Sequence, residues 1–238
     1  MITVACVYKT GGDYTWSYVD YLAAGVRANV DCSYRFVCLS DAKRDDQQFI
    51  DEIIPLRCGW PGWWAKFELF QLDGPLLYID LDTVVVGNID KLIKYIVASD
   101  NILVMLRGFY KQDQCSGILG WNGSLKWVFD TFVNRYMPGA VFQSDPRVLR
   151  LTTGQRRYRG DQELLRELVA SRRVVQFAQD VMTGIYSYKV NIRKRRRKRE
   201  ELPSDSKIVC FHGRPRPSEL PEDNELRRRW CGTIPKNG

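Results

Sequence analysis

Short apolar runs alternate along the chain with segments in which apolar residues recur every three or four positions. The runs at 2–8, 34–39 and 76–79 are rich in aliphatic and aromatic residues, so each predicts a β-strand. Apolar residues at helical spacing from Trp16 to Val26 predict a helix between the first two strands. Further strands are predicted at 49–56, 102–106 and 207–211, and further helices at 63–72, 89–97, 123–137 and 161–170.

These strands are apolar on both faces and alternate with helices. That order is typical of an α/β fold with a Rossmann-like mixed, mainly parallel sheet flanked by helices. Ligands of such sheets bind at the carboxyl ends of the strands, where we expect the polar residues that follow four of the predicted strands to converge on one crevice. These residues are Tyr8-Lys9, Ser40-Asp41, Asp80 with Asp82, and His212.

Two aspartates, Asp80 and Asp82, interrupt the apolar stretch from Leu76 to Val86. Neighbouring buried carboxylates repel each other, and each loses hydration. A shared divalent cation removes both penalties, and alternate residues of an extended segment point to the same side. Carboxylate oxygens suit Mg²⁺ or Mn²⁺, so the pattern predicts a metal site. The alternative interpretation is that both aspartates are turn residues at the end of a strand.

His212 is the only histidine, and it follows the predicted strand 207–211. An imidazole ligand would shift the metal preference towards Mn²⁺. Gly213 permits close backbone approach, and Arg214 and Arg216 can each bind a phosphate through two N–H groups. These residues predict a site for a metal ion or a diphosphate. The alternative is a structural histidine held by hydrogen bonds.

Composition limits the class of protein. A chain of 238 residues with 45% hydrophobic content suits one large domain with a packed core. No apolar run approaches the roughly 20 residues that span a bilayer, and the first residues lack the features of a signal peptide, so we expect a cytoplasmic protein. Seven cysteines without a C-x-x-C pair argue against a disulfide framework and a structural zinc site.

The net charge of +8 favours polyanionic partners such as nucleotide diphosphates, nucleic acid or acidic lipid surfaces. Much of this charge lies in the run 193–199, and a second basic cluster at 227–229 precedes Trp230. We expect the first run to be a solvated loop. The alternatives are a patch that binds a DNA or anionic glycan acceptor, and attraction to a membrane surface.

The segment Trp60-Pro61-Gly62-Trp63-Trp64 concentrates three indole rings at the start of the predicted helix 63–72. Aromatic faces stack on sugars and bases, so the segment is a candidate for ligand contact. Core packing at the start of a helix is the commoner use of such residues, and we expect it here.

Three motifs occur in the order in which GT-A glycosyltransferases carry them. They are Tyr78-Ile79-Asp80-Leu81-Asp82, Gly160-Asp161-Gln162 and His212-Gly213-Arg214-Pro215-Arg216-Pro217. Over 2–217 the chain most resembles the glycogenin-like and lipopolysaccharide galactosyltransferase-like group (family 8 type). The resemblance implies a GT-A fold, a nucleotide-sugar transferase domain over 1–217 and a C-terminal tail over 218–238.

The same resemblance implies roles for individual residues. Asp80, Asp82 and His212 would hold Mn²⁺ or Mg²⁺ on the diphosphate of a nucleotide sugar, and Asp161 and Gln162 would contact the transferred sugar. The remaining donor-binding positions would be Val7, Tyr8 and Asp41 for the nucleoside, Lys66 on the helix before the Asp80 strand, and Arg214 or Arg216 for the diphosphate.

The chain departs from the family pattern at two places. The usual Asn-Ala-Gly segment is Cys115-Ser116-Gly117 here. The C-terminal motif of the family usually has a spacer between His and Gly and a Lys before Pro, whereas this chain has His-Gly-Arg-Pro-Arg-Pro. The first departure affects a predicted sugar contact, and the second assigns the diphosphate contact to arginine.

We therefore expect a metal-dependent hexosyl- or pentosyltransferase that uses a nucleotide sugar, most simply a UDP-sugar. A metal would stabilise the charge on the leaving diphosphate, and a carboxylate such as Asp161 would favour positive charge on the sugar. The alternative for Asp161 is an N-cap of the helix 161–170, and the two roles are compatible.

The motifs leave the acceptor open between a glycan or lipid-linked sugar and a hydroxymethylated DNA base. One alternative function is a nucleic-acid-binding protein on a degenerate transferase fold. Another is a nucleotide-sugar hydrolase or pyrophosphorylase. The short, acidic segment 10–13 argues against a pyrophosphorylase, because those enzymes usually carry a glycine-rich loop with a basic residue there.

Overall fold

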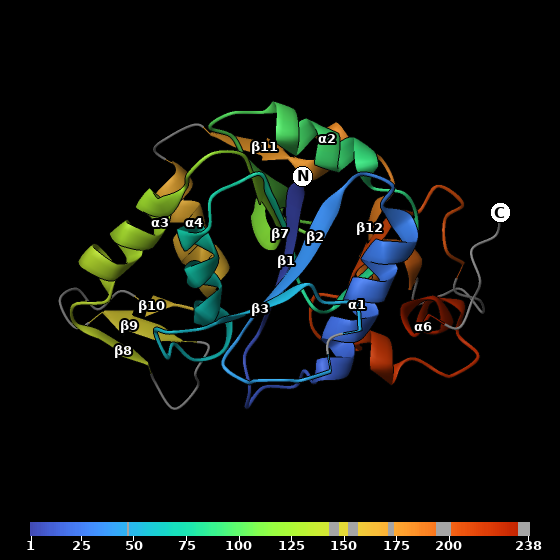
Figure 1. The fold of residues 1–238 in the computed structure, drawn as a ribbon, viewed down its shortest axis with the longest axis horizontal. Helices are drawn as coiled ribbons and strands as arrows, with labels where there is room; N and C mark the ends of the chain where they lie inside the picture. Colours follow the sequence, from blue (N-terminus) through green and yellow to red (C-terminus); the bar gives the residue numbers. More distant parts are fainter. Residues whose placement is uncertain (47, 143–147, 152–156, 171–173, 194–200, 233–238) are drawn as a thin grey trace.

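A seven-stranded sheet forms the centre of the computed structural model, which describes residues 1–46, 48–142, 148–151, 157–170, 174–193 and 201–232 (Figure 1). Its strands run in the order β11 (Val175–Phe177), β6 (Leu103–Arg107), β7 (Gln114–Trp121), β4 (Leu76–Ile79), β1 (Ile2–Tyr8), β2 (Tyr34–Ser40) and β3 (Glu52–Pro55). β7 pairs antiparallel with β4 and β6, and every other pairing in the sheet is parallel. The expected mixed, mainly parallel sheet is confirmed.

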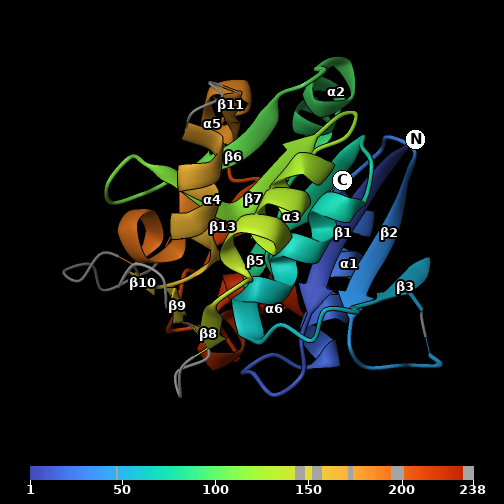
Figure 2. The same ribbon diagram turned by 90° about the vertical axis from the view of Figure 1, so that its left-hand side faces the viewer.

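Successive residues of the central strands point to opposite faces of the sheet, and each face carries its own core. Val4, Cys6 and Leu77 belong to the core under one face, whereas Ala5 and Tyr78 belong to the core under the other. The first core includes residues from α1 (Trp16–Asn29), α2 (Asp90–Ala98), α5 (Ala178–Val181), the π-helix η3 (Tyr188–Ile192) and α6 (Glu225–Trp230). The second includes residues from the 3₁₀ helix η1 (Gly62–Gln71), α3 (Lys126–Thr131), the π-helix η2 (Phe132–Tyr136) and α4 (Asp161–Ala170). Figures 1 and 2 show these helices on the two sides of the sheet.

Two small sheets extend the central one. The first contains β12 (Ile185–Ser187), β13 (Ile208–Cys210) and β5 (Thr83–Val85), in that order. Because β5 begins one residue after Asp82 and pairs antiparallel with β13, this sheet brings the chain near 211 beside the two aspartates. The second contains β10 (Arg157–Tyr158), β9 (Leu149–Leu151) and β8 (Ala140–Phe142), and it leads into α4.

Several predicted elements have the expected bounds, and others differ for identifiable reasons. The strands 2–8 and 76–79 and the helix 161–170 match β1, β4 and α4. The predicted helix 63–72 is a 3₁₀ helix, in which residues three apart lie on the same side. Trp64, Phe67 and Phe70 follow that spacing, and all three are buried.

Strand β7 was not predicted, because its centre contains Ser116, Gly117 and Gly120, which weaken the strand pattern. The structure gives a reason for one of these glycines. A Cβ atom at Gly120 would lie 2.4 Å from Cδ1 of Ile96 on α2. Gly120 therefore lets α2 pack directly on the middle of the sheet. The predicted helix 123–137 is divided into α3 and the π-helix η2.

The segment that follows Pro217 contributes to the first core. Trp230 of α6 is buried, and its ring lies 4.9 Å from that of Tyr18 and 4.6 Å from that of Tyr21, both on α1. Leu220 and Leu226 are buried in the same core. The residues as far as Trp230 therefore pack on the domain. In the described ranges, no helix combines the length and apolar character needed to cross a bilayer.

Replacing Trp230 by alanine tests this packing. Trp230→Ala should lower the free energy of unfolding by about 3–5 kcal/mol, because it removes a large buried ring and leaves a cavity beside α1. Urea unfolding followed by circular dichroism measures the change. Val97→Ala, at an exposed position of α2, is the control and should leave the midpoint nearly unchanged. Equal midpoints for the two variants would contradict the packing.

Candidate functional site

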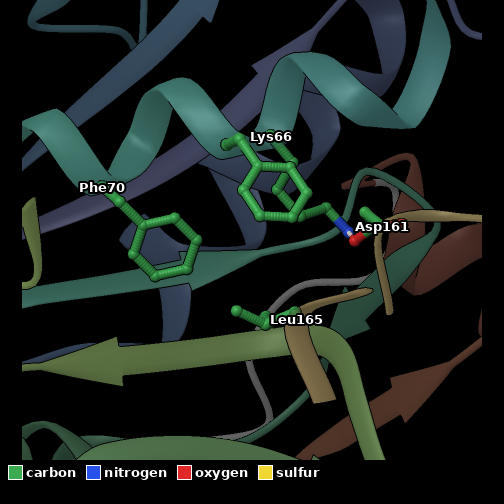
Figure 3. A pocket seen from close by; sticks show the side chains of 5 residues that line it. Lys66, Phe70, Asp161 and Leu165 are labelled. Atoms are coloured by element: carbon green, nitrogen blue, oxygen red, sulfur yellow. Dashed lines mark ion pairs between the residues drawn. The ribbon is translucent and has the colours of Figure 1, made fainter. Parts of the chain in front are cut away.

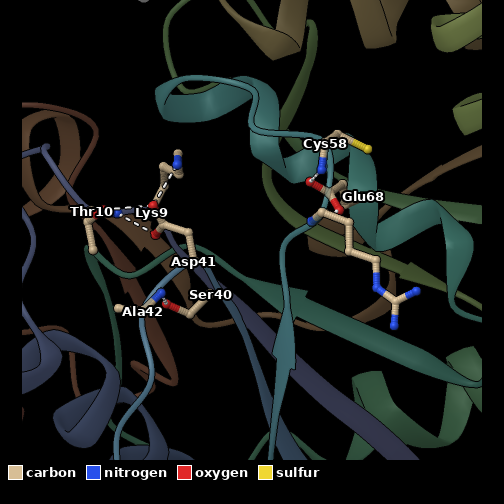
Figure 4. A network of polar contacts seen from close by, with 8 residues as sticks. Lys9, Thr10, Ser40, Asp41, Ala42, Cys58 and Glu68 are labelled. Carbon is tan, nitrogen blue, oxygen red and sulfur yellow. Dashed lines mark hydrogen bonds and ion pairs between the residues drawn. The ribbon is translucent and has the colours of Figure 1, made fainter.

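The carboxyl ends of β1 and β2 meet at Asp41, as expected for parallel neighbours (Figure 4). The ammonium group of Lys9 lies 2.5 Å from Oδ2 of Asp41, and the backbone N–H and hydroxyl of Thr10 donate to the same carboxylate at 2.9 and 2.7 Å. Partial burial acts to raise the pKa of Asp41, but these donors lower it to about 2. Asp41 is therefore ionised and fixes the loop that follows β1.

The other predicted nucleoside positions lie at the end of the same strand. Tyr8 is buried, with its ring 4.7 Å from that of Trp16, and Val7 is half-buried against the second core. Burial raises the pKa of Tyr8, so its hydroxyl stays protonated. The structure places these residues beside Asp41, and their contact with a nucleoside stays a prediction.

Lys66 of η1 forms a buried ionic cluster with two carboxylates from different elements (Figure 3). Its Nζ atom lies 3.0 Å from Oδ1 of Asp80, which follows β4, and 3.0 Å from Oδ2 of Asp161, the first residue of α4. Burial alone would lower the pKa of Lys66, but the charges of Asp161 and Asp80 raise it above its usual value. The Lys66 side chain therefore stays charged, and it joins three elements at one point.

The hydroxyl of Ser116 completes the cluster. It donates to Oδ2 of Asp161 at 2.6 Å, and Lys66 donates to the same hydroxyl at 3.2 Å. Asp161 is the first helical residue of α4, one position after an N-cap, and its carboxylate contacts Ser116 and Lys66. Sequence reasoning treated Ser116 only as a departure from a family motif, because a strand serine carries no signal of its own.

Two further contacts position the cluster. The carboxylate of Glu68, two residues after Lys66 on η1, accepts hydrogen bonds from the backbone N–H groups of Arg57 and Cys58 at 2.8 and 3.0 Å, which fixes the approach to η1 (Figure 4). The hydroxyl of Tyr78 donates to Asp80. Burial raises the pKa of the Cys115 thiol, whereas the side chain of Gln162, next to Asp161, acts to lower it. The sugar contact expected of Gln162 stays a prediction.

Asp82 is buried, with 8% of its surface exposed. Burial and the nearby charge of Asp80 raise its pKa to about 7, although a hydrogen bond with Tyr14 and the charges of Arg216 and Lys66 act in the opposite direction. Near neutral pH, Asp82 therefore still binds a proton that an exposed aspartate would have lost. A cation bound beside it would restore the charged form.

The end of β13 reaches the aspartates through the backbone. The N–H of Phe211 donates to the carbonyl oxygen of Asp82 at 3.1 Å, so His212 follows directly beside the pair. The imidazole Nε2 lies 2.6 Å from the Ser187 hydroxyl, and the ring lies against Phe109 and Tyr110 with centroids 5.7 and 5.5 Å away. Burial and the charge of Lys189 lower the pKa of His212.

The structure does not bring the three predicted metal ligands into one coordination group. Over the described part of the chain, no three or more His, Cys, Asp or Glu side chains are arranged to hold an ion. Asp80 and Asp82 lie together, whereas the imidazole of His212 is bonded to Ser187. A metal role for the three residues stays a prediction.

The two predicted phosphate-binding arginines contact a loop that the motifs did not indicate. Arg216 lies 4.3 Å above the ring of Tyr14, and its Nη2 atom lies 2.6 Å from Asp13. Its Nε and Nη1 atoms are buried and have no hydrogen-bond partner among the described residues. Arg214 is exposed and pairs with Glu219. Sequence reasoning missed Asp13 and Tyr14 because a short polar loop shows no periodic pattern.

The structure describes the second of the two basic clusters in full and only one residue of the first. Residues 194–199 of the run 193–199 lie outside the described residues. In the second cluster, Arg229 pairs with Glu225 at 2.8 Å, and Arg227 donates to the carbonyl oxygen of Leu220. At least these two arginines of α6 are used within the chain.

Solved structures of glycosyltransferases share this fold. The glycosyltransferase GlyE of Streptococcus pneumoniae TIGR4 matches with a TM-score of 0.65 and 13% identity over 98% of this chain and 59% of its own. The galactosyltransferase LgtC matches with a TM-score of 0.58 and 14% identity over 98% of both chains. The bifunctional glycosyltransferase WbbM has a TM-score of 0.57 and 11% identity over 91% of this chain and 46% of its own.

Protein-family models and curated protein sequences give no match. The chain spans less than two thirds of GlyE and of WbbM but almost all of LgtC. At such low identities the likeness shows the fold alone. The GT-A fold that the three motifs implied is confirmed.

The raised pKa of Asp82 predicts a pH-dependent stability when divalent cations are removed. Between about pH 4 and 7 the folded state holds a proton that the unfolded chain has lost, so stability falls as pH rises, by up to about 1.4 kcal/mol per pH unit. Asp82→Asn removes this dependence. Urea unfolding in EDTA at pH 5, 6 and 7 should show the wild type losing stability relative to the variant.

Asp130→Asn is the control for this experiment, because Asp130 is half-exposed and pairs with Lys126 one turn away on the helix surface. Its stability relative to the wild type should change little over the same range. A constant difference between wild type and Asp82→Asn would show that Asp82 is ionised throughout.

Proposed function

We propose that this chain is a metal-dependent glycosyltransferase that moves a sugar from a nucleotide diphosphate sugar, most simply a UDP-sugar, to a hydroxyl group. The observation that carries the proposal is the pair Asp80 and Asp82 at the carboxyl end of β4 in a GT-A fold, close enough to Arg216 for its charge to act on Asp82. The carboxylates suit a divalent cation, and the two free donors of Arg216 suit a phosphate.

Asp80 and Asp82 fit a divalent cation on electrostatic grounds. Asp82 is buried beside a second carboxylate, and that arrangement favours either a proton or a cation. His212 adjoins the pair through the Phe211 backbone, and it would have to release Ser187 to become a third ligand. Mn²⁺ or Mg²⁺ held there would act as a Lewis acid on the diphosphate.

The residues around the cluster have separate roles in this proposal. Asp41, at the ends of β1 and β2, belongs to the nucleoside end of the donor site together with Val7 and Tyr8. Arg216 binds the diphosphate through Nε and Nη1. Asp161 is held in place by Lys66 and Ser116, and its carboxylate favours positive charge at the anomeric carbon as the bond to the diphosphate breaks.

The acceptor in this proposal is the hydroxyl of a glycan or of a lipid-linked sugar. The nucleic-acid alternative depended on the two basic clusters. Arg227 and Arg229 are engaged with partners of their own chain, which leaves less of the second cluster for phosphates. In the described residues, no observation favours a DNA acceptor over a carbohydrate.

Metal-dependent nucleotide binding tests the proposal directly. Mn²⁺ should tighten UDP binding to the wild type by roughly tenfold or more, equivalent to about 1.4 kcal/mol, as measured by isothermal titration calorimetry. Asp82→Asn should abolish this gain, because one carboxylate of the pair is lost, whereas Asp130→Asn should retain it. A wild-type UDP affinity that is the same with and without Mn²⁺ would contradict a metal-bridged diphosphate.

Asp13 provides a second test, because its carboxylate occupies one side of Arg216. A bound diphosphate would compete with that carboxylate for the guanidinium group. Asp13→Asn should therefore tighten UDP binding by several-fold in the same titration. The gain should be smaller at high salt, because salt screens the competing Asp13–Arg216 ion pair of the wild type. Weaker UDP binding by the variant would show that Asp13 supports the donor site instead of competing with the donor.

A further inference from the structure

Two aromatic side chains are exposed among the residues that the structure describes. Trp63 is 44% exposed and Tyr110 is 70% exposed. Single exposed aromatic residues are common, so their exposure alone shows little. Trp63 differs from its neighbours in the same segment, because Trp60 and Trp64 are buried in the second core. Core packing, the expected role of the segment, therefore holds for these two rings but leaves Trp63 unexplained.

The ring of Trp63 lies against the backbone beside Asp161. A Cβ atom at Gly160 would lie 3.3 Å from Cε3 and 3.5 Å from Cζ3 of Trp63, and Gly160 has a φ of +148°, which disfavours other residues. Gly160 directly precedes Asp161 in the chain. A glycine is thus used where the indole ring approaches the start of α4.

Trp63 also precedes Lys66 by three residues in η1. Residues three apart on a 3₁₀ helix lie on the same side, so Trp63 and Lys66 share a side of η1. Lys66 in turn contacts Asp161. Trp63 is therefore an exposed wall next to the buried Lys66–Asp161 pair. It shares η1 with Lys66, and its ring lies against Gly160, which directly precedes Asp161.

Trp63 lies on the side of the sheet away from Asp41, which is at the proposed nucleoside end of the donor site. Asp41 follows β2, Asp80 follows β4, and Ser116 lies on β7, which is the order of these strands across the sheet. Trp63 belongs to the side of Ser116 and Asp161. A donor that extends from Asp41 past Asp80 to Asp161 would not cover the exposed ring of Trp63. That ring would therefore be free to contact the acceptor.

We propose that Trp63 is the stacking wall of the acceptor subsite and that it binds the apolar C–H face of a saccharide ring. This inference rests on the proposed function. An indole face stacks on such a ring, and the carboxylates near it accept hydrogen bonds from sugar hydroxyls. The carboxylates of Asp80 and Asp161 contact the ammonium group of Lys66, so this paired group has no net positive charge that would attract a nucleic-acid backbone.

In the transfer, an acceptor hydroxyl oxygen bonds to the anomeric carbon of the donor. The bond between that carbon and the diphosphate oxygen breaks, and its electron pair stays on the diphosphate. The hydroxyl proton leaves with the nucleoside diphosphate product. Trp63 takes no part in these bond changes, and it determines which acceptor ring is held beside Asp161.

Saturation-transfer NMR tests the subsite without knowledge of the donor sugar. The full chain with UDP and Mn²⁺ is screened against methyl glycosides of common hexoses and disaccharides. The expected result is transfer to the ring C–H protons of at least one glycoside with the wild type and with Trp63→Phe. Trp63→Ala should bind that glycoside about tenfold more weakly, while its UDP affinity with Mn²⁺ stays at the wild-type value. Val97→Ala is the control for loss of an exposed apolar side chain.

The outcomes separate this inference from the proposed function. Glycoside binding that is unchanged in Trp63→Ala would overturn the subsite while the Mn²⁺-dependent UDP binding of the wild type still supports a transferase. Wild-type protein that binds hydroxymethylated DNA in place of every glycoside would overturn the saccharide acceptor. Loss of UDP affinity in Trp63→Ala would place the ring in the donor site, and wild-type protein without Mn²⁺-dependent UDP binding would overturn both proposals.

Discussion

The ammonium group of Lys66 lies between the carboxylates of Asp80 and Asp161, and the arrangement of the site depends on this contact. Burying any one of these charges alone would be costly, and removing one partner of a buried ion pair is strongly destabilising. The three residues come from η1, the end of β4 and the start of α4. Because Ser116 adds β7 to the same cluster, elements from four parts of the chain are held in one place.

This balance of charge leaves Asp82 without a cation of its own. Lys66 contacts Asp80 and Asp161, so the partners of Asp82 are the hydroxyl of Tyr14 and the more distant charge of Arg216. Without such a cation, the pKa of Asp82 is raised, and Arg216 forms its ion pair with Asp13. In the proposed function, a metal ion would replace the proton on Asp82, and a diphosphate would replace Asp13 at Arg216.

Local sequence was sufficient for the elements whose pattern agrees with their environment. β1 and β4 are apolar runs that are buried on both faces, and α4 has one apolar face, so their bounds could be predicted. β7 was not predictable, because Gly120 is required by contact with Ile96 and weakens the strand pattern. The 3₁₀ form of η1 was also missed, since an aromatic spacing of three residues within a helical stretch is a weak signal.

The sequence by itself determined the α/β class, the position of the paired aspartates and the basic C-terminal motif, because each depends on residues that are close together in the chain. Only the tertiary structure decided that Ser116 joins Lys66 and Asp161, that Tyr14 and Asp13 meet Asp82 and Arg216, and that Trp63 faces outward. These contacts join segments separated by tens to hundreds of residues. A single sequence carries no local signal for them, since their partners are set by how the strands pair and how the helices pack on the sheet.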